Sequence, residues 1–274
     1  MPELPEVETV RRALAPKLVG RRIQSIAVTE TRLRVPIDEK ALGRHTAGRV
    51  VEHLGRRGKF LIAYLSDQGR LIIHLGMSGS LTLASPESPR PAHTHATFSL
   101  DSGKELRFRD PRRFGLIAAM SASEADVWAP LARLGVEPLT EALTPAYLAT
   151  AASRTTRAIK PLLMDNGVVT GIGNIYASEA LHVAGVHPFR RASRISTARL
   201  CRIVDAVTDV LTRAISAGGT TISDFASVDG SPGWFQLSLA VYARAGEPCH
   251  RCGKTIRSKV QCGRSTYYCP GCQT

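Results

Sequence analysis

Apolar residues between positions 20 and 120 occur in short runs or alternate with polar residues. Residues 60–65 and 71–75 form two such runs around a turn sequence, and residues 97–100 and 106–108 form a second pair around another turn. Short alternating runs separated by turn residues are typical of antiparallel hairpins. This part of the chain is therefore predicted to form a β-sandwich or a barrel.

Beyond about residue 125 the apolar spacing becomes helical. From residue 200 to 215 apolar side chains recur at i, i+3, i+4 and i+7, and two glycines follow, which predicts a long amphipathic helix. A shorter helix is expected around residues 161–164, and another opens at Asn174 after a glycine-containing turn. The change of period places a domain boundary near residues 120–140.

The first residues, MPELPEVETV, predict a helix that begins at Pro5, because proline suits the first helical position. This leaves Pro2 and Glu3 unexplained. Removal of Met1 would expose the secondary amine of Pro2, and a neutral amine can attack a carbonyl-like carbon. Glu3 could then relay protons. Most proteins that begin Met-Pro use neither residue chemically, so this pattern alone indicates little.

The charge composition indicates which class of partner the protein binds. The formal net charge is +13 and the pI is about 10.0, and such an excess indicates a polyanionic partner, most often nucleic acid. A basic surface that serves only solubility is the alternative. The basic residues, mostly arginines, are spread along the chain, which favours a folded basic face. No apolar run approaches a membrane span, and the N-terminus lacks secretory signal features, so a cytoplasmic protein is expected.

Four of the six cysteines form two C-x2-C pairs separated by sixteen residues: Cys249, Cys252, Cys269 and Cys272. This spacing is typical of a structural zinc site, and we expect one Zn²⁺. Disulfides are the alternative, but a cytoplasmic location disfavours them. Cys262 lacks a near neighbour at ligand spacing and is interpreted as a bystander. Arg264 is expected at the tip of a hairpin between the two pairs, where it could meet phosphates.

Ordered motifs run along the whole chain: MPELPEVETVRR, GRRGKF, HLGMSGSL, DPRRFG, IKPLLMDN, GIGNIYASEAL, FQLSLAVYARAGEPC and GRSTYYCPGCQ. Together they resemble those of the bacterial formamidopyrimidine-DNA glycosylases. The resemblance implies an α+β multidomain fold. It places an antiparallel β-sandwich over residues 1–130, a helical helix–two-turn–helix domain over 131–235, and a zinc-finger hairpin over 236–274.

The same resemblance implies a bifunctional DNA glycosylase and AP lyase of base excision repair. Such an enzyme acts on damaged double-stranded DNA as a monomer in the cytoplasm, associated with the nucleoid, and removes 8-oxoguanine and formamidopyrimidines. Pro2 would be the nucleophile at C1′ and Glu3 its acid. Lys59 would assist β-elimination, and Arg264 would serve δ-elimination and phosphate binding.

Three residues resemble the group that fills the gap left by an extruded nucleotide. These are Met77, Arg112 and Phe114, which supply two apolar wedges and a cation that can bond to the orphaned base. Core packing is the alternative for Met77 and Phe114. Both are flanked by glycine and polar residues, however, which favours exposed loop positions.

Four further residues resemble DNA contacts of the family: His93, Thr155, Lys160 and Asn174. At two of them this sequence departs from the family pattern. His93 is the first residue of His-Thr-His, where His-Asp-His is expected, and Thr155 lies where the family usually has lysines. Residues 218–234, rich in Gly, Ser and Thr, correspond to the loop that covers an extruded purine.

Two other functions stay open. A non-catalytic DNA-binding protein could keep the zinc finger, although the presence of Pro2, Glu3 and Lys59 argues against it. A Nei-type glycosylase would act on oxidised pyrimidines, but we would then expect a glycine in place of Leu4. The purine glycosylase is therefore the leading hypothesis.

Overall fold

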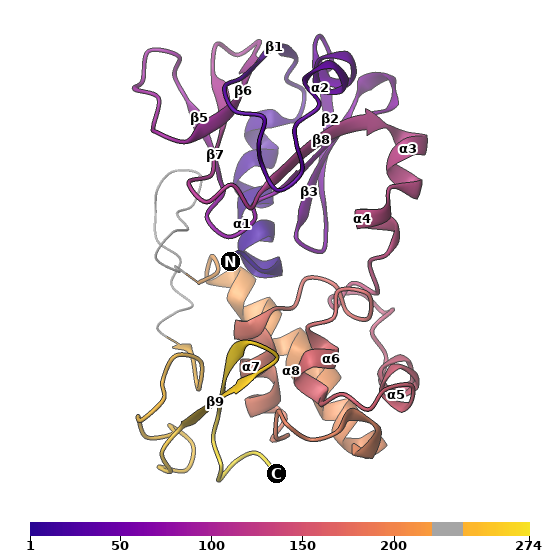
Figure 1. Cartoon of the computed structure of the whole chain (residues 1–274), viewed down its shortest axis with the longest axis vertical. Coiled ribbons are helices and arrows are strands. Elements are labelled where there is room, and N and C mark those ends of the chain that lie inside the picture. Colours follow the sequence, from indigo (N-terminus) through magenta and orange to yellow (C-terminus); the bar gives the residue numbers. More distant parts are fainter. Residues whose placement is uncertain (221–237) are drawn as a thin grey trace. The chain divides into compact units, whose positions relative to one another are not determined.

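The computed structural model describes residues 1–220 and 238–274 (Figure 1). These residues form two compact units, one of residues 1–132 with 218–220 and one of residues 133–217 with 238–274. Most of the loop expected to cover an extruded purine lies outside the described residues. Among the helices that are described, none has both the length and the apolar character needed to cross a membrane.

The first unit contains two four-stranded antiparallel sheets, as the alternating runs predict. In order across the first sheet the strands are β1 (Ile23–Val28), β6 (Thr94–Leu100), β7 (Glu105–Arg109) and β5 (Ser80–Ala84). Across the second sheet they are β2 (Val51–Arg57), β3 (Phe60–Leu65), β4 (Gly69–His74) and β8 (Leu116–Ser121). The predicted hairpins β3–β4 and β6–β7 are both present.

Helix α1 (Leu4–Leu18) lies against the sheets of the first unit (Figure 1). Its apolar stripe belongs to the core that the two sheets share. The stripe comprises Val7, Val10, Leu14 and Leu18. The helix begins at Leu4, one residue before the predicted start, so Pro5 is its second residue. Proline is tolerated there because an N–H in the first turn has no partner within the helix.

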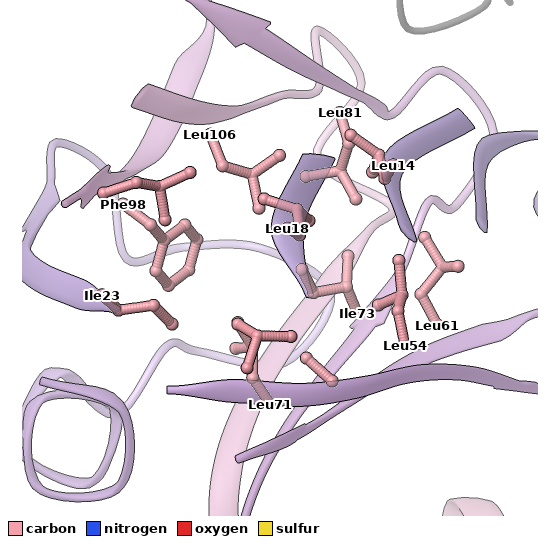
Figure 2. Close-up of a pocket in the computed structure, with 13 residues that line it drawn as sticks. Leu14, Leu18, Ile23, Leu54, Leu61, Leu71, Ile73, Leu81, Phe98 and Leu106 are labelled. Carbon is pink, nitrogen blue, oxygen red and sulfur yellow. The ribbon is translucent and has the colours of Figure 1, made fainter. Parts of the chain in front are cut away.

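The sandwich core retains a small cavity of about 20 Å³, lined by apolar side chains of α1 and both sheets (Figure 2). Leu14 and Leu18 border it from the helix, and Phe98 borders it from β6. A water molecule in a cavity needs several polar partners. These side chains offer none, so the cavity is expected to be dry.

Short helices complete the first unit. They are α2 (Glu39–Thr46), α3 (Ala122–Val127), α4 (Ala129–Ala132) and the single turn η1 (Ser66–Gln68). Ala125 of α3 packs with Ile62 and Ile72, and Trp128 lies against this small cluster. The second sheet therefore carries apolar residues on both faces.

The second unit is helical and ends in a two-stranded finger. Its helices are α5 (Pro145–Ser153), α6 (Ile159–Leu163), α7 (Asn174–Val183), the turn η2 (Ala192–Arg194) and α8 (Thr197–Ser216). The finger strands are β9 (Arg257–Gln261) and β10 (Arg264–Tyr268). The predicted helix over residues 200–215 is confirmed as α8, and its apolar face is buried. Cys262 and Gly263 join β9 to β10 with positive φ of 49° and 72°, as two-residue hairpins of this type require.

Candidate active site and metal centre

Pro2 and Glu3 are both buried at the start of α1. The backbone N–H of Glu3 donates to Glu6 Oε2 at 2.8 Å. The other oxygen of Glu6 accepts from the backbone N–H of Thr220 at 2.8 Å and from the Thr220 hydroxyl at 3.0 Å. Glu6 therefore fixes the backbone beside the predicted nucleophile and ties it to residue 220.

Lys59 lies buried in the turn between β2 and β3. Arg56 connects this turn to α1, because its Nε donates to Glu8 Oε2 at 3.2 Å and its Nη1 donates to the carbonyl of Gly58 at 2.9 Å. The turn that carries Lys59 is thus held against the helix that begins with Pro2 and Glu3. The structure places these three predicted catalytic residues in one unit.

Glu8 is the centre of an ion-pair cluster on the same helix. Its carboxylate accepts from Arg11 and Arg12 at 2.8 Å and from Arg56 at 3.2 Å. Burial alone would raise the pKa of Glu8, but the hydrogen bonds from Arg11 and Arg12 and the nearby positive charges lower it to about 2. Glu8 is therefore ionised at neutral pH and stabilises the α1–β2 contact.

His74, which begins the HLGMSG motif, lies beside the turn that carries Lys59 and was not singled out from the sequence. Its ring lies 4.9 Å from the ring of Phe60, and its Nδ1 accepts from the Gly76 N–H at 2.9 Å. Burial, and then the positive charge of Lys59, lower the pKa of His74 to about 4. The imidazole is neutral at physiological pH and positions the turn before Met77.

Phe114 and Met77 lie on two loops that touch through their backbones. A Cβ built on Gly76 would lie 2.4 Å from the carbonyl carbon of Phe114, so only glycine allows this approach. The Phe114 side chain is 44% exposed, and the Arg112 guanidinium lies 5.1 Å from its ring centre. Met77 is half-buried. Phe114 is therefore not a core residue, and the three predicted gap-filling residues lie on adjoining loops.

Asp110, which the sequence reasoning did not single out, joins these loops. It is fully buried, and its Oδ1 accepts from the Ser78 hydroxyl at 2.6 Å. Its Oδ2 accepts from the Gly115 N–H at 2.7 Å, and Ser78 Oγ accepts from the Arg112 N–H at 3.2 Å. One buried carboxylate thus sets the relative position of the Met77 and Phe114 loops.

His93 is exposed and has a positive φ of 67°. Its carbonyl accepts from the Asp110 N–H at 3.0 Å. The Thr94 hydroxyl donates to the carbonyl of Pro91 at 2.7 Å, and His95 Nε2 donates to the carbonyl of Asp110 at 2.7 Å. The His-Thr-His sequence thus forms a closed network in which threonine stabilises the local turn, and the His93 ring faces solvent.

In the second unit, Asn174 is the first residue of α7 and contacts the finger. Its Nδ2 donates to the carbonyl of Ser265 at 2.9 Å. Lys160 Nζ donates to Asn174 Oδ1 at 2.5 Å and to the Thr266 hydroxyl at 2.7 Å. Lys160 is only 1% exposed. Its buried ammonium group is therefore placed to orient the Asn174 side chain.

Thr155 is half-buried, whereas Arg264 is exposed. The Thr155 hydroxyl accepts from the backbone N–H of Arg157 at 3.2 Å and from its Nε at 3.3 Å. Arg264 is exposed as the first residue of β10, just after the hairpin turn. It lines a groove together with Lys160 and Gln261.

The four predicted metal ligands converge. Their sulfur atoms all lie within 4.8 Å of one another, with Cys249–Cys272 at 3.8 Å and Cys252–Cys269 at 3.4 Å. A tetrahedron with Zn–S bonds of about 2.3 Å has S–S edges of about 3.8 Å. The described thiols therefore fit Zn²⁺ and need little rearrangement. Cys262 is exposed at the hairpin turn and is not part of the cluster.

The thiols differ in acidity without metal. Burial raises the pKa of Cys249, but the Arg251 backbone N–H and the His182 ring more than offset it, and the pKa falls to about 6. Burial, followed by the neighbouring thiols, raises the pKa of Cys272 to about 12. A bound cation favours the thiolate form of every ligand, so metal binding would release protons.

Family models match successive parts of the chain. The model described as "Formamidopyrimidine-DNA glycosylase N-terminal domain" matches residues 1–117, and "Formamidopyrimidine-DNA glycosylase H2TH domain" matches residues 134–226. "Zinc finger found in FPG and IleRS" matches residues 246–274. The last match and the converging sulfur atoms together identify a structural zinc site.

Relatives and solved structures match over the full length. The formamidopyrimidine-DNA glycosylase of Thiobacillus denitrificans is 48% identical and that of Xanthomonas euvesicatoria 45% identical, each with 100% of both chains covered. The crystal structure of MutM (Fpg) from Thermus thermophilus has a TM-score of 0.90 and 38% identity, with 99% of this chain and 98% of that chain covered.

Two DNA complexes of Lactococcus lactis Fpg are also similar to this chain in structure. A variant bound to Fapy-dG-containing DNA has a TM-score of 0.92 and 35% identity, with 100% of both chains covered. A complex with abasic-site DNA has a TM-score of 0.91 and 34% identity, with 99% of both chains covered.

Proposed function

Because the chain belongs to the formamidopyrimidine-DNA glycosylase family, we propose that it excises oxidised purines from double-stranded DNA and then cleaves the strand at the abasic site. The observation that carries this proposal is the buried start of α1, where Glu6 holds the backbone next to Pro2. The Fapy-dG and abasic-site complexes of the Lactococcus lactis relative support both substrates.

Pro2 supplies the nucleophile once Met1 has been removed. Its secondary amine attacks C1′, the bond from C1′ to the base breaks, and an iminium joins the sugar to the protein. Glu3, the next residue, relays the protons that ring opening and base departure require. The iminium acidifies the C2′ proton. Loss of that proton breaks the bond to the 3′ phosphate, and a second elimination breaks the bond to the 5′ phosphate.

Lys59 assists the first elimination from the turn that Arg56 fastens to α1. Met77 and Phe114 occupy the gap left by the extruded nucleotide, and Arg112 bonds to the orphaned base. The exposed Phe114 ring and its contact with the Arg112 guanidinium support this division of roles. Asp110 keeps the two loops together while the stacked base is displaced.

The second unit grips the DNA backbone. Asn174, oriented by Lys160, and the exposed Arg264 of the finger contact phosphates. Arg264 also serves the second elimination, and His93 and Thr155 add contacts elsewhere on the strand. The bound Zn²⁺ supplies a structural cross-link that holds the finger hairpin in shape. The protein acts as a monomer, and its net charge of +13 favours residence on nucleoid DNA.

Borohydride trapping tests the proposal on a duplex with 8-oxoguanine opposite cytosine. The protein with a free Pro2 amine should form a reduced covalent adduct, and Pro2→Gly should keep some trapping through its primary amine. A protein with an uncleaved N-terminal extension should form none, because an internal proline nitrogen is not basic. An extended protein that traps at the normal rate would assign the nucleophile to a lysine.

A matched duplex with an oxidised pyrimidine and one with a preformed abasic site separate the alternatives. Efficient trapping on the purine lesion together with the abasic site supports the proposal. Preferential excision of the pyrimidine would instead favour Nei-type specificity. Binding without trapping on any substrate would identify a non-catalytic DNA-binding protein.

A further inference from the structure

His182 is a buried histidine that the proposed chemistry does not use. It lies in the last turn of α7 and is 6% exposed. Its Nε2 lies 3.6 Å from the sulfur of Cys249, which is itself 3% exposed. The same sulfur accepts from the backbone N–H of Arg251 at 3.4 Å. The Cys249 sulfur thus receives one donor from inside the finger and faces one from a helix outside it.

Metal binding determines the direction of the His182 contact. A zinc-bound thiolate carries no proton and can only accept, so Nε2 must carry the hydrogen. Four thiolates around Zn²⁺ have a formal charge of −2, and most of that charge is on sulfur. A buried N–H directed at one sulfur offsets part of this charge where water cannot. The contact therefore stabilises the metal-bound form of the site.

Helix α7 contacts the segment that contains the finger at three points along its length. Asn174 at its start donates to the carbonyl of Ser265, and Glu179 accepts three backbone N–H groups of residues 240–242. His182 lies three residues beyond Glu179, so both side chains project from one face of the helix. The His182 contact connects this face directly to a metal ligand.

We infer that His182 is a positioning residue of the zinc site, which donates Nε2–H to the Cys249 thiolate and so raises zinc affinity and links metal occupancy to the position of α7. The inference does not depend on the proposed glycosylase activity, because it concerns only the metal centre. A histidine that merely fills space would need a ring at this position but no N–H.

The test uses the full-length zinc-loaded protein and two substitutions. His182→Phe keeps an aromatic ring but removes the donor, and His182→Gln restores an N–H of similar reach. Competition with a chromogenic chelator measures the zinc affinity of each. We expect His182→Phe to bind zinc about 10- to 100-fold more weakly, the usual cost of losing a ligand's hydrogen-bond partner. We expect His182→Gln to recover most of the affinity.

His187 provides a matched control. It is half-buried in the same unit, and its ring lies 4.6 Å from that of Tyr268 on β10. It contacts aromatic rings and backbone rather than a metal ligand, so His187→Phe should retain wild-type zinc affinity. A comparable loss in this variant would mean that any aromatic substitution near the finger disturbs the site, and would overturn the assignment to the N–H.

The absorption spectrum of the cobalt-substituted protein reports the hydrogen bond to the thiolate and not side-chain packing alone. Loss of a hydrogen bond to a thiolate raises the energy of the sulfur electrons, so the thiolate-to-Co²⁺ charge-transfer band of His182→Phe should shift to longer wavelength. Measurement at saturating Co²⁺ reports the bond even if the variant binds metal weakly. An unshifted band, or equal losses of zinc affinity in His182→Phe and His182→Gln, would overturn the inference.

Discussion

Glu179 offers the sharpest test of how the helical unit holds the finger segment. The carboxylate is 3% exposed, and its Oε1 accepts from the N–H groups of Val241 and Tyr242 at 2.9 and 2.8 Å. Its Oε2 accepts from the Ala240 N–H at 2.8 Å. Glu179→Gln preserves the shape of the side chain but replaces one oxygen with an NH2 group. That group faces an N–H and cannot accept its hydrogen bond.

The size of the effect follows from these three contacts. A buried hydrogen bond to a charged group contributes about 1.5–3 kcal/mol, a neutral one about 0.5–1.5, and a buried donor left unmatched costs about 1–3. Two weakened bonds and one unmatched donor therefore destabilise the attachment by roughly 3–5 kcal/mol. Because about 1.4 kcal/mol is a tenfold change in an equilibrium, exchange at these amides should accelerate by about a hundredfold or more.

Hydrogen exchange measured on residues 240–242 checks this directly, and DNA affinity should fall in parallel. Glu247→Gln is the control, because Glu247 lies in the same segment but has an exposed carboxylate, which pairs with Arg244 at 2.7 Å. Its loss should change stability by no more than about 1 kcal/mol. Unchanged protection in Glu179→Gln, or equal changes in both variants, would refute the assigned role of the buried carboxylate.

Four further outcomes are expected. Met77→Ala combined with Phe114→Ala should impair removal of a paired lesion far more than cleavage of a preformed abasic site, since wedges act mainly when a stacked base is extruded; equal losses would place these side chains in the core. Cys252→Ser should lose zinc and DNA binding by metal analysis and gel shift, and retained zinc would implicate Cys262. The logarithm of the DNA association constant should fall with log salt by roughly 0.9 per phosphate contacted, and a flat response would contradict the interpretation of the charge. Glu8, with its pKa lowered from 4.5 to about 2, stabilises the fold fully above pH 4.5 and loses this contribution as the pH falls towards 2. In acid unfolding, Glu8→Gln should lack this pH dependence of stability. The same pH dependence below 4.5 in the variant and the wild type would contradict the role given to Glu8.

The elements and the metal ligands could be predicted because their signals are local. The apolar spacing of α8 extends over a few helical turns, and the apolar runs of β3 and β4 each extend over a few residues. Two C-x2-C pairs predict a shared ion because each pair forms its own turn. Ordered motifs then carried the resemblance to the family. Helix α1 begins one residue before the start predicted from the sequence, because helix ends depend on capping contacts that spacing does not encode.

The supporting side chains needed the tertiary structure. Asp110 contacts Ser78, 32 residues away, and Glu6 contacts Thr220, 214 residues away. His182 and Cys249 are 67 residues apart. No periodicity or spacing connects such positions, because folding alone decides which distant groups share a buried site. Lys160 likewise contacts Thr266, 106 residues away.

By itself, then, the sequence determined the strand and helix types and the zinc ligands, because those properties depend on residue type and short spacing. The other candidate site residues were predicted from ordered motifs that resemble those of the family. Only the tertiary structure decided which buried carboxylates, imidazoles and ammonium groups hold these residues in place. Burial makes an unmatched polar group costly, so each of them must have a partner, and that partner is supplied by whichever segment the fold brings alongside.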